Sequence, residues 1–399
     1  MGAGGFIRSF GFPNGFAPNC KNTQMKNYFK SLKTWVLVDR TAIAHNFKVF
    51  CGLLSKKCLL MAVVKSNSYG HDIIAYSKHM EKFGADYLGV DDIEEALKLR
   101  KNGIKIPILV FGYVPAELIG GAVKNKISLT VSNFEMLSGL SKIKSLVQVH
   151  IKVDTGLGRQ GFLPNQLKKV IEILKNSSHI KVQGLYSHFS GIESRKFNAY
   201  SEKQAEELRW WRDAFKLAGL RPIVHMSSTA GILASSQFHF DMVRLGIGGY
   251  GLWPSEEIQK GLIKKIKLQP ALSWQTVISE IKNLSKGNKV GYDLSETLKR
   301  DSVVGVCPVG YWHGYSRALS NKGEVLVLGQ RAKVLGRVSM DMIVVDLTGI
   351  KGVKRGDMAV LIGRSGKEQI SAEELAGKAN TINYEIVTRI NPEISRIYL

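Results

Sequence analysis

The sequence predicts an α/β protein in which a (β/α)8 barrel of the TIM type is followed by an all-β domain. Two observations carry this prediction. Between residues 35 and 252, short apolar runs recur at regular intervals, and helix-like segments separate them. After Trp253 the helix-like segments give way to alternating strand patterns punctuated by Gly and Asn, which is typical of antiparallel sheets.

Eight apolar runs are expected to supply the barrel strands. Eight strand–helix units over about 200 residues are typical of a closed barrel, and a doubly wound sheet is the alternative. Ser132, with Glu135 three residues later, and the pair Asp91–Asp92 are expected to begin two of the intervening helices. The eight runs are LMAVV at 60, DYLGV at 86, PILVF at 107, ISLTV at 127, VQVHIKV at 147, VQGLYSHF at 182, PIVHM at 222 and DMVRLGI at 241.

Three segments follow from this pattern. The barrel is expected over 35–252 and the β domain over 253–399, and the first run, WVLV at 35, either belongs to the barrel or joins the β domain. Residues 1–24 contain five glycines, two prolines and no carboxylate. They lack the charged and apolar regions of a secretory signal, so we expect a disordered N-terminal extension.

The apolar content and the distribution of charge argue against two classes of partner, membranes and nucleic acids. The 399 residues are 44% apolar and 22% charged, and no run of eighteen strongly apolar residues exists, so we expect no membrane partner. The net charge of +23 is spread along the chain without five consecutive Lys or Arg. We therefore expect no nucleic-acid partner. A basic scaffold that binds nucleic acid is the rival class, and salt-dependent retention on DNA would reveal it.

The cysteines indicate neither a metal site nor a disulfide framework. They lie far apart, without a CxxC pair or a zinc-ligand spacing. We therefore expect that the protein binds no metal, that its thiols are free and that it is cytoplasmic. The four residues are Cys20, Cys51, Cys58 and Cys307.

The most informative segment is AVVKSNSYGH at 62–71, where an apolar strand runs into a lysine and then into turn residues. Lys65 is expected at the C-terminal end of the second barrel strand, the face at which catalytic groups of such barrels collect. A lysine beside apolar residues can lose its proton and form a Schiff base. The alternative is a strand-end lysine that reaches solvent.

Two segments match the dinucleotide pattern GxGxxG, at 156–161 and at 246–251. The pattern alone is weak. A nicotinamide site also needs an acidic residue near the end of the next strand, and VQGLYSHF has none there. We therefore do not expect nicotinamide binding.

The segment around Lys65 resembles the AVVKANAYGH signature of the alanine racemase family, whose members depend on pyridoxal 5'-phosphate (PLP) and have fold type III. Further segments resemble that family in the same order over roughly residues 33 to 399. They are KVDTGLGRQG, HFS, HMSST, VRLGIGGYGL, VGYD, PVGYWHGYSR, GRVSMD and INYE. The fold that the resemblance implies, a PLP-binding barrel with a β domain, agrees with the pattern described above.

The resemblance implies a role for each matching residue around the cofactor. Lys65 would hold PLP covalently, and Arg244 would face the pyridine nitrogen. The two histidines of HFS and HMSST, His188 and His225, would also lie at the cofactor. Thr229 stands where the family usually has a serine, so the hydroxyl is kept. The residues implied for the phosphate are Tyr69, Thr229, Gly246, Ile247 and Tyr384.

The resemblance also implies a two-base racemase. Lys65 would serve one face of the substrate and Tyr292, reached from the partner of a homodimer, the other; Asp293 stands where the family usually has glycine. Arg159 would bind the substrate carboxylate, and Lys152 would be carbamylated. Three further residues would line the substrate: Met340, Asp341 and Tyr311.

The implied activity is interconversion of L-alanine and D-alanine, which supplies D-alanine for peptidoglycan. Three alternatives of the same fold remain open at this point. They are a serine racemase, a broad-specificity amino-acid racemase and a noncatalytic PLP-binding barrel.

Overall fold

The structure is a computed structural model that describes residues 31–194, 196 and 198–399. The expectation for residues 1–24 lies outside these residues. The chain divides into two compact units. One unit comprises Val38–Ala271 with Tyr398–Leu399, and the other comprises residues 31–37 with Leu272–Ile397.

The first unit contains the predicted closed barrel of eight parallel strands. The strands follow one another around the barrel in sequence order, and the last pairs with the first, as Arg244 opposite Met61 illustrates. The eight apolar runs therefore form the barrel, which rules out the doubly wound sheet. The strands are β2 (Leu59–Val63), β3 (Tyr87–Val90), β4 (Ile108–Val110), β5 (Ile127–Val131), β6 (Val147–Lys152), β7 (Ile180–Tyr186), β8 (Ile223–His225) and β9 (Met242–Leu245).

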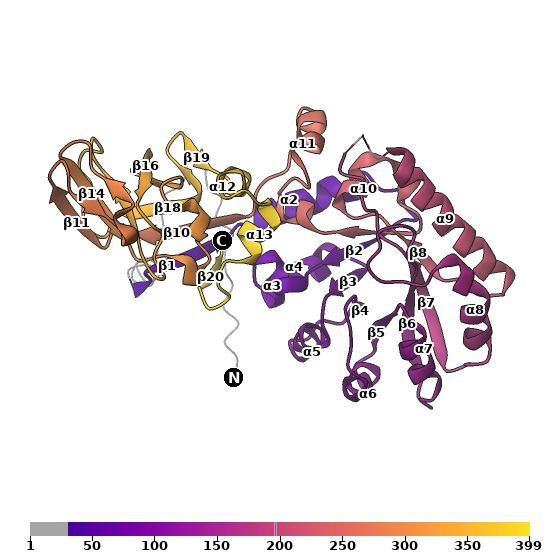
Figure 1. Ribbon diagram of the computed structural model, residues 1–399. Coiled ribbons are helices and arrows are strands. Elements are labelled where there is room, and N and C mark those ends of the chain that lie inside the picture. Colours follow the sequence, from indigo (N-terminus) through magenta and orange to yellow (C-terminus); the bar gives the residue numbers. More distant parts are fainter. Residues whose placement is uncertain (1–30, 195, 197) are drawn as a thin grey trace, which may run out of the picture. The chain divides into compact units, whose positions relative to one another are not determined.

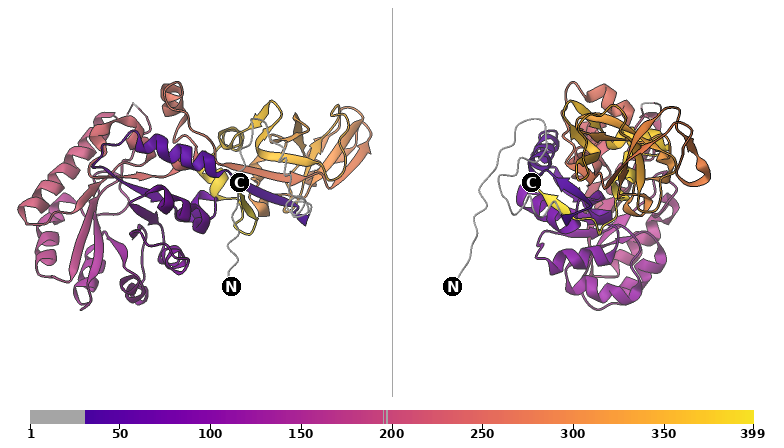
Figure 2. Two further views of the ribbon diagram at one scale, coloured as in Figure 1. Left: turned by 180° about the vertical axis from the view of Figure 1, so that it is seen from behind. Right: turned by 90° about the vertical axis from the view of Figure 1, so that its left-hand side faces the viewer.

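Helices lie outside the ring of strands in both views of the barrel (Figures 1 and 2). Asp92 caps α5 by accepting the Glu95 N–H at 2.8 Å, as expected. The cap of α7 is Asn133, not Ser132, because the Asn133 side chain accepts the Met136 N–H. The helices of this unit are α2 (Arg40–Cys51), α3 (Lys65–Tyr69), α4 (Ile73–Phe83), α5 (Ile93–Lys101), α6 (Ala116–Lys124), α7 (Phe134–Ser141), α8 (Leu167–Lys175), α9 (Asn198–Leu217), α10 (Thr229–Ala234) and α11 (Glu256–Leu262).

The second unit contains a mainly antiparallel sheet. Ten strands among the described residues run in the order β11-β14-β17-β16-β15-β18-β10-β1-β20, with β19 beside β18. The strands are β1 (Thr34–Val38), β10 (Leu272–Val277), β11 (Glu280–Leu284), β14 (Ser302–Cys307), β15 (Glu324–Val327), β16 (Gln330–Leu335), β17 (Ile343–Asp346), β18 (Met358–Ser365), β19 (Glu368–Ile370) and β20 (Arg396–Tyr398). Two short strands, β12 (Lys289–Val290) and β13 (Glu296–Thr297), pair separately.

The first apolar run of the chain belongs to this sheet and not to the barrel. In Figure 1 the indigo strand β1 lies beside the orange β10 and the yellow β20. The Thr34 hydroxyl donates to the Gln275 carbonyl, and the Trp35 indole donates to the Gln275 side chain at 2.9 Å. Lys65 therefore follows the first strand of the closed barrel, and the expectation that it follows the second barrel strand is wrong.

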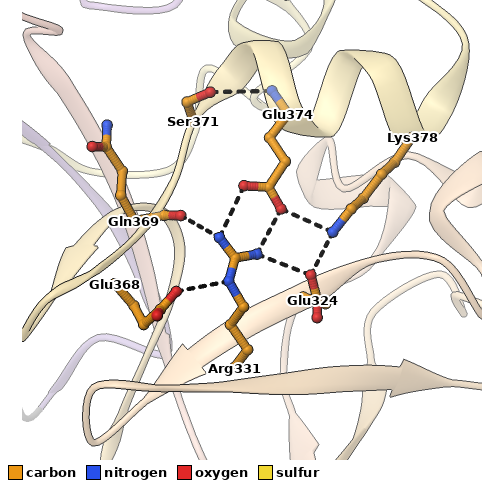
Figure 3. A network of polar contacts seen from close by, with 7 residues as sticks. All are labelled: Glu324, Arg331, Glu368, Gln369, Ser371, Glu374 and Lys378. Atoms are coloured by element: carbon orange, nitrogen blue, oxygen red, sulfur yellow. Dashed lines mark hydrogen bonds and ion pairs between the residues drawn. The ribbon is translucent and has the colours of Figure 1, made fainter.

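Two helices accompany the sheet, so this unit is not purely β. They are α12 (Ala372–Ala379) and α13 (Asn383–Thr388). Arg331 of β16 bonds both oxygens of Glu374 on α12, as well as Glu324 and Glu368 (Figure 3). Lys378 joins the same network by donating to Glu324 and Glu374. These bonds tie α12 to the sheet.

Candidate active site

The segment after β2 carries the candidate lysine on a left-handed turn. Four consecutive residues, Ser66 to Tyr69, have φ between 51° and 55°, and Gly70 follows at 84°. Left-handed backbone costs about 1–2 kcal/mol per non-glycine residue. Such strain is characteristic of functional sites, and here it brings Lys65 and Tyr69 onto one short turn.

Glu95 holds this turn against the end of β3. One carboxylate oxygen of Glu95 accepts the Asn67 N–H at 3.0 Å, and the other accepts the Asp91 N–H at 3.2 Å. Burial raises the pKa of Glu95, and the two backbone donors oppose that shift. The result is that Lys65 and Asp91 face each other, with Nζ 3.1 Å from Oδ1.

Tyr69 belongs to an aromatic stack that fixes its ring. Its ring stacks on the Tyr250 ring with centroids 4.7 Å apart. The Tyr76 ring also stacks on Tyr250, with centroids 4.4 Å apart. The Tyr250 hydroxyl donates to the Val63 carbonyl at the end of β2. Burial raises the pKa of Tyr69 well above its ordinary value. Its hydroxyl therefore stays protonated and can donate a hydrogen bond.

A small cradle lies where the last two barrel strands end. A Cβ on Gly246 would lie 3.0 Å from the Tyr69 hydroxyl oxygen and 3.9 Å from Oγ1 of Thr229. The Thr229 hydroxyl is buried and accepts the N–H groups of Gly246 and Gly248, each at 3.2 Å. Ile247 is buried beside them at the start of a 3-10 helix, Ile247–Tyr250. This is the place at which TIM-type barrels bind phosphate.

Arg244 of β9 is buried and held by four groups. Nη1 lies 2.8 Å from Nδ1 of His225, and Nη2 lies 2.9 Å from Nδ1 of His188. Nη2 also donates to the carbonyls of Ser187 and Met226. Burial lowers the pKa of Arg244 to about 10. The guanidinium is therefore charged at neutral pH and fixed in one orientation.

Both histidines bound to Arg244 are neutral acceptors. Burial, together with Arg244 nearby, lowers the pKa of His188 and of His225 well below the ordinary value. A guanidinium donates and never accepts. Nδ1 of each ring must therefore be unprotonated, and the single proton of each imidazole is on Nε2.

Lys152, at the end of β6, is buried, and near neutrality a substantial fraction of its amine is uncharged. Its Nζ donates to the Val153 carbonyl at 2.6 Å and lies 5.5 Å from the centre of the Tyr186 ring. Burial lowers the pKa of Lys152 to about 7; Asp154 opposes this, and Arg244 and Arg159 add to it. A neutral amine is the form that reacts with carbon dioxide, so the site suits carbamylation.

Arg159 lies exposed on the glycine loop that follows β6. Asp154 organises this loop, because its Oδ1 accepts the N–H groups of Gly156, Leu157 and Gly158 and its Oδ2 accepts that of Arg159. The N–H groups that a pyrophosphate would need at a GxGxxG loop are thus bonded to a carboxylate. The loop serves to present Arg159 beyond the strand.

Tyr186 is a central residue that the sequence analysis missed. Its ring lies parallel to that of His225 at 4.7 Å, and Arg244 lies 5.4 Å from its centre. Its hydroxyl bonds Thr130 at 2.8 Å, and burial raises its pKa to about 12. Tyr186 therefore packs on both Lys152 and Arg244. The available sequence signal was its position two residues after Gly184 on β7, because residues two apart on a strand lie on the same face.

The second unit brings three of its predicted site residues together. The Tyr311 N–H donates to the Ser339 carbonyl, and the Trp312 N–H donates to the Met340 carbonyl, each at 3.0 Å. Asp341 lies 3.9 Å from Nδ1 of His313. Tyr311, Met340 and Asp341 thus lie on two loops that contact each other.

Tyr292 lies on an adjoining loop of the same unit. A Cβ on Gly291 would lie 2.9 Å from the backbone nitrogen of Arg337. The Nε atom of Arg337 lies 3.4 Å from Oδ2 of Asp293. Asp293 has φ 58°, a conformation in which Asp is better tolerated than most residues. The change from the family's usual glycine is therefore compatible with this turn. The Tyr292 side chain is 70% exposed.

Tyr384 lies on α13, whose C-terminal end packs on the Tyr311 loop. A Cβ on Gly314 would lie 2.3 Å from the Arg389 carbonyl oxygen.

No group of three or more His, Cys, Asp or Glu side chains in the described part of the chain is arranged to hold a metal ion. Within that part, no helix is long and apolar enough to cross a bilayer.

These features define a barrel protein with a lysine at the C-terminal end of its strands, a small polar cradle on the same face and a fixed buried arginine. Comparison with known proteins names the family. The model of the alanine racemase N-terminal domain matches residues 38–254, and that of the alanine racemase C-terminal domain matches residues 271–398. The chain belongs to the alanine racemase family.

Individual relatives agree over nearly the whole chain. The alanine racemase of Methanococcus maripaludis is 38% identical over 371 residues, which are 92% of this chain and 98% of that relative. The structure of alanine racemase from Bacillus anthracis with bound L-Ala-P is 36% identical, with a TM-score of 0.87 over 92% of this chain and 95% of that one. The structure from Bartonella henselae, which carries covalently bound pyridoxal phosphate, is 26% identical, with a TM-score of 0.81 over 92% of this chain and all of that one.

Proposed function

We propose that this chain is a PLP-dependent racemase that interconverts L-alanine and D-alanine and so supplies D-alanine for peptidoglycan. One observation carries the proposal. Lys65 lies on the same left-handed turn as Tyr69, whose hydroxyl borders the cradle formed with Thr229 and Gly246. A lysine for the aldehyde and a separate polar cradle for the phosphate are the two attachments that PLP requires.

The residues present fit this cofactor. The Tyr69 and Thr229 hydroxyls and the backbone at Gly246 and Ile247 would hold the phosphate, with the Gly246 N–H exchanging its bond to the neutral Thr229 hydroxyl for one to the phosphate. Tyr384 would add a further hydroxyl. When bound, PLP supplies an electron sink that lets the Cα proton of an amino acid leave. Arg244 would face the ring nitrogen and, being charged, would disfavour protonation there. That preference favours racemisation over transamination.

Racemisation needs a proton donor or acceptor on each face of Cα. In this proposal Nζ of Lys65 moves the proton on one face, and the hydroxyl of Tyr292 from a partner chain moves it on the other. Arg159 binds the substrate carboxylate. Lys152, as a carbamate, would be an anion able to orient Arg159 by a charge-assisted hydrogen bond.

The exposed edge of the second unit supports a homodimer with shared sites. Tyr292, Trp312 and Met340 are 70%, 58% and 54% exposed and lie on contacting loops. Contiguous exposed apolar side chains are typical of interaction surfaces. Met340, Asp341 and Tyr311 of one chain would then line the substrate site of the other.

The cysteines support the expected location. Those among the described residues, Cys51, Cys58 and Cys307, are free thiols. Unpaired thiols suit a reducing compartment, so we place the reaction in the cytoplasm.

Alanine is the proposed substrate because three tyrosines, Tyr292, Tyr311 and Tyr384, would leave room for little beyond a methyl group. Serine racemase or broad-specificity racemase activity is the alternative. The test incubates the PLP-loaded protein with single L-amino acids and follows the loss of optical rotation. Alanine should racemise fastest, and slower turnover of serine is compatible, since a pocket discriminates one small group by only about 10–200-fold. Faster racemisation of serine, lysine or arginine would reject the assignment.

A further inference from the structure

His150 is a fully buried histidine of the barrel interior to which the family resemblance gave no role. It lies on β6, two residues before Lys152. The pairing of β6 with β7 shifts register between Val149 and His150, which places His150 opposite Gly184. A Cβ on Gly184 would lie only 2.0 Å from Nδ1 of His150. A strand irregularity and a glycine therefore both accommodate this imidazole.

Its contacts join it to the buried arginine. Nδ1 of His150 lies 2.9 Å from Nε2 of His225, and Nδ1 of His225 lies 2.8 Å from Nη1 of Arg244. The direction of each hydrogen bond can be derived by starting from Arg244. Because Arg244 only donates, His225 accepts on Nδ1 and carries its proton on Nε2. That proton is donated to Nδ1 of His150, so His150 carries its own proton on Nε2.

The chain of hydrogen bonds ends at His150. Its Nε2 is buried without a hydrogen-bond partner among the described residues. Burial lowers the pKa of His150 to about 3, which keeps the imidazole neutral. A buried N–H without an acceptor is unfavourable, and an apolar side chain in this place would avoid that cost.

We propose that His150 is a positioning residue that fixes the tautomer of His225 and thereby aims the Arg244 guanidinium. The acceptor on His150 keeps the His225 proton on Nε2, and only then is Nδ1 of His225 free to accept from Arg244. The other three acceptors of Arg244, which are Ser187, Met226 and His188, all bond Nη2. His225 bonds the other terminal nitrogen and thus sets the rotation of the group. The consequence for catalysis rests on the proposed function, in which Arg244 faces the cofactor ring.

Two substitutions separate an acceptor from mere volume. His150→Gln retains a side-chain oxygen that can accept from His225, whereas His150→Leu fills the space without an acceptor. His239→Gln is the matched control, because His239 is also buried and bonds the Ile232 carbonyl, away from this chain.

The first measurement uses cofactor-free protein labelled with nitrogen-15 in histidine. In the wild type, the nitrogen spectrum should show His225 protonated on Nε2 and unprotonated on Nδ1. The pattern should persist in His150→Gln and His239→Gln and be lost in His150→Leu. Protonation of His225 on Nδ1 in the wild type would overturn the proposal even if the leucine variant does not fold.

The second measurement is steady-state kinetics of the PLP-loaded proteins. His150→Leu should lower kcat about tenfold with KM changed less than twofold, because one buried hydrogen bond to the arginine is lost. His150→Gln should recover most of the rate. Equal losses in the two variants would show a packing role and overturn the proposal. If the wild type shows the expected tautomer but does not racemise alanine, the proposed function fails while the assignment of the His225 tautomer stands.

Discussion

The Nζ atom of Lys65 lies 3.1 Å from Oδ1 of Asp91, across the ends of the first two barrel strands. This pair keeps the amine at the mouth of the barrel, on the side to which the left-handed turn also brings Tyr69. Both side chains are substantially exposed, at 40% and 51%. Their attraction is therefore weak, and an arriving aldehyde can displace Asp91 from the lysine.

We predict that Lys65 is the residue to which PLP becomes attached. Borohydride reduction of the loaded protein, followed by peptide mapping, should place the pyridoxyl label on Lys65. Lys65→Ala should abolish the label, and Asp91→Asn should leave it in place. A label on Lys152 or on another lysine would refute the site.

We predict that Gly246→Ala weakens binding of PLP but not of pyridoxal, which lacks the phosphate. The added Cβ would lie 3.0 Å from the Tyr69 hydroxyl oxygen and enter the cradle. Titrations followed by cofactor absorbance should show at least a tenfold rise in the Kd for PLP, equivalent to about 1.4 kcal/mol. Gly120→Ala is the control, because its Cβ would meet nothing within 4 Å. An equal loss for both ligands would place the phosphate elsewhere.

We predict that Lys152 makes the cofactor-free protein less stable as the pH falls. Its folded pKa is about 7, below the ordinary value of about 10.4. Between these values the unfolded chain binds more protons, so the free energy of unfolding should rise with pH from about 7 to about 10. In Lys152→Met this rise should be smaller by about 1.4 kcal/mol per unit of pKa difference.

Urea unfolding in buffer free of carbon dioxide, repeated across this range, measures that dependence. Lys169→Met is the control, since Lys169 lies on α8 with its ammonium over the Phe134 ring. Identical pH dependence in the wild type and Lys152→Met would contradict the prediction. Adding bicarbonate should then raise the mass of the intact wild-type protein by one carbon dioxide, and Lys152→Met should show no such gain.

We predict that two inactive variants restore activity together. Lys65→Ala and Tyr292→Ala homodimers each lack one base at both sites. A heterodimer of the two has one site with both bases intact, so its rate should approach half that of the wild type. Purified heterodimers that remain inactive, beside an active wild-type dimer treated identically, would show that both bases come from one chain.

We predict that Arg331→Met destabilises the protein more than loss of an isolated surface pair. Arg331 bonds three carboxylates and the Gln369 carbonyl, two of these bonds being bidentate to Glu374. These partners raise the pKa of Arg331. A partly exposed network of this kind should contribute about 1–3 kcal/mol. Arg300→Met, which breaks one pair with Asp346, should cost under about 1 kcal/mol by urea unfolding, and equal costs would contradict the prediction.

The sequence by itself determined the eight strand–helix units, the position of the lysine after an apolar strand and the change to an antiparallel unit, whereas closure of the strands into a barrel was decided by the structure. These features are encoded locally, because the spacing of apolar runs and turn residues can be recognised within each short segment of the sequence. The helix start at Asp92 was found for the same reason. The start at Asn133 was missed by one residue, because the cap depends on which N–H groups the first turn leaves free.

Only the tertiary structure decided the rest. The strand Thr34–Val38 pairs with segments more than 200 residues away, so its sheet cannot be read from its own sequence. His150 and Tyr186 resemble ordinary interior residues of barrel strands, and their roles arise from rings and hydrogen bonds supplied by other strands. Neither the lowered pKa of Lys152 nor the tautomer of His225 has a sequence signature. The lowered pKa of Lys152 follows from burial. The tautomer of His225 follows from Arg244 and His150, which other strands place on the two sides of its ring.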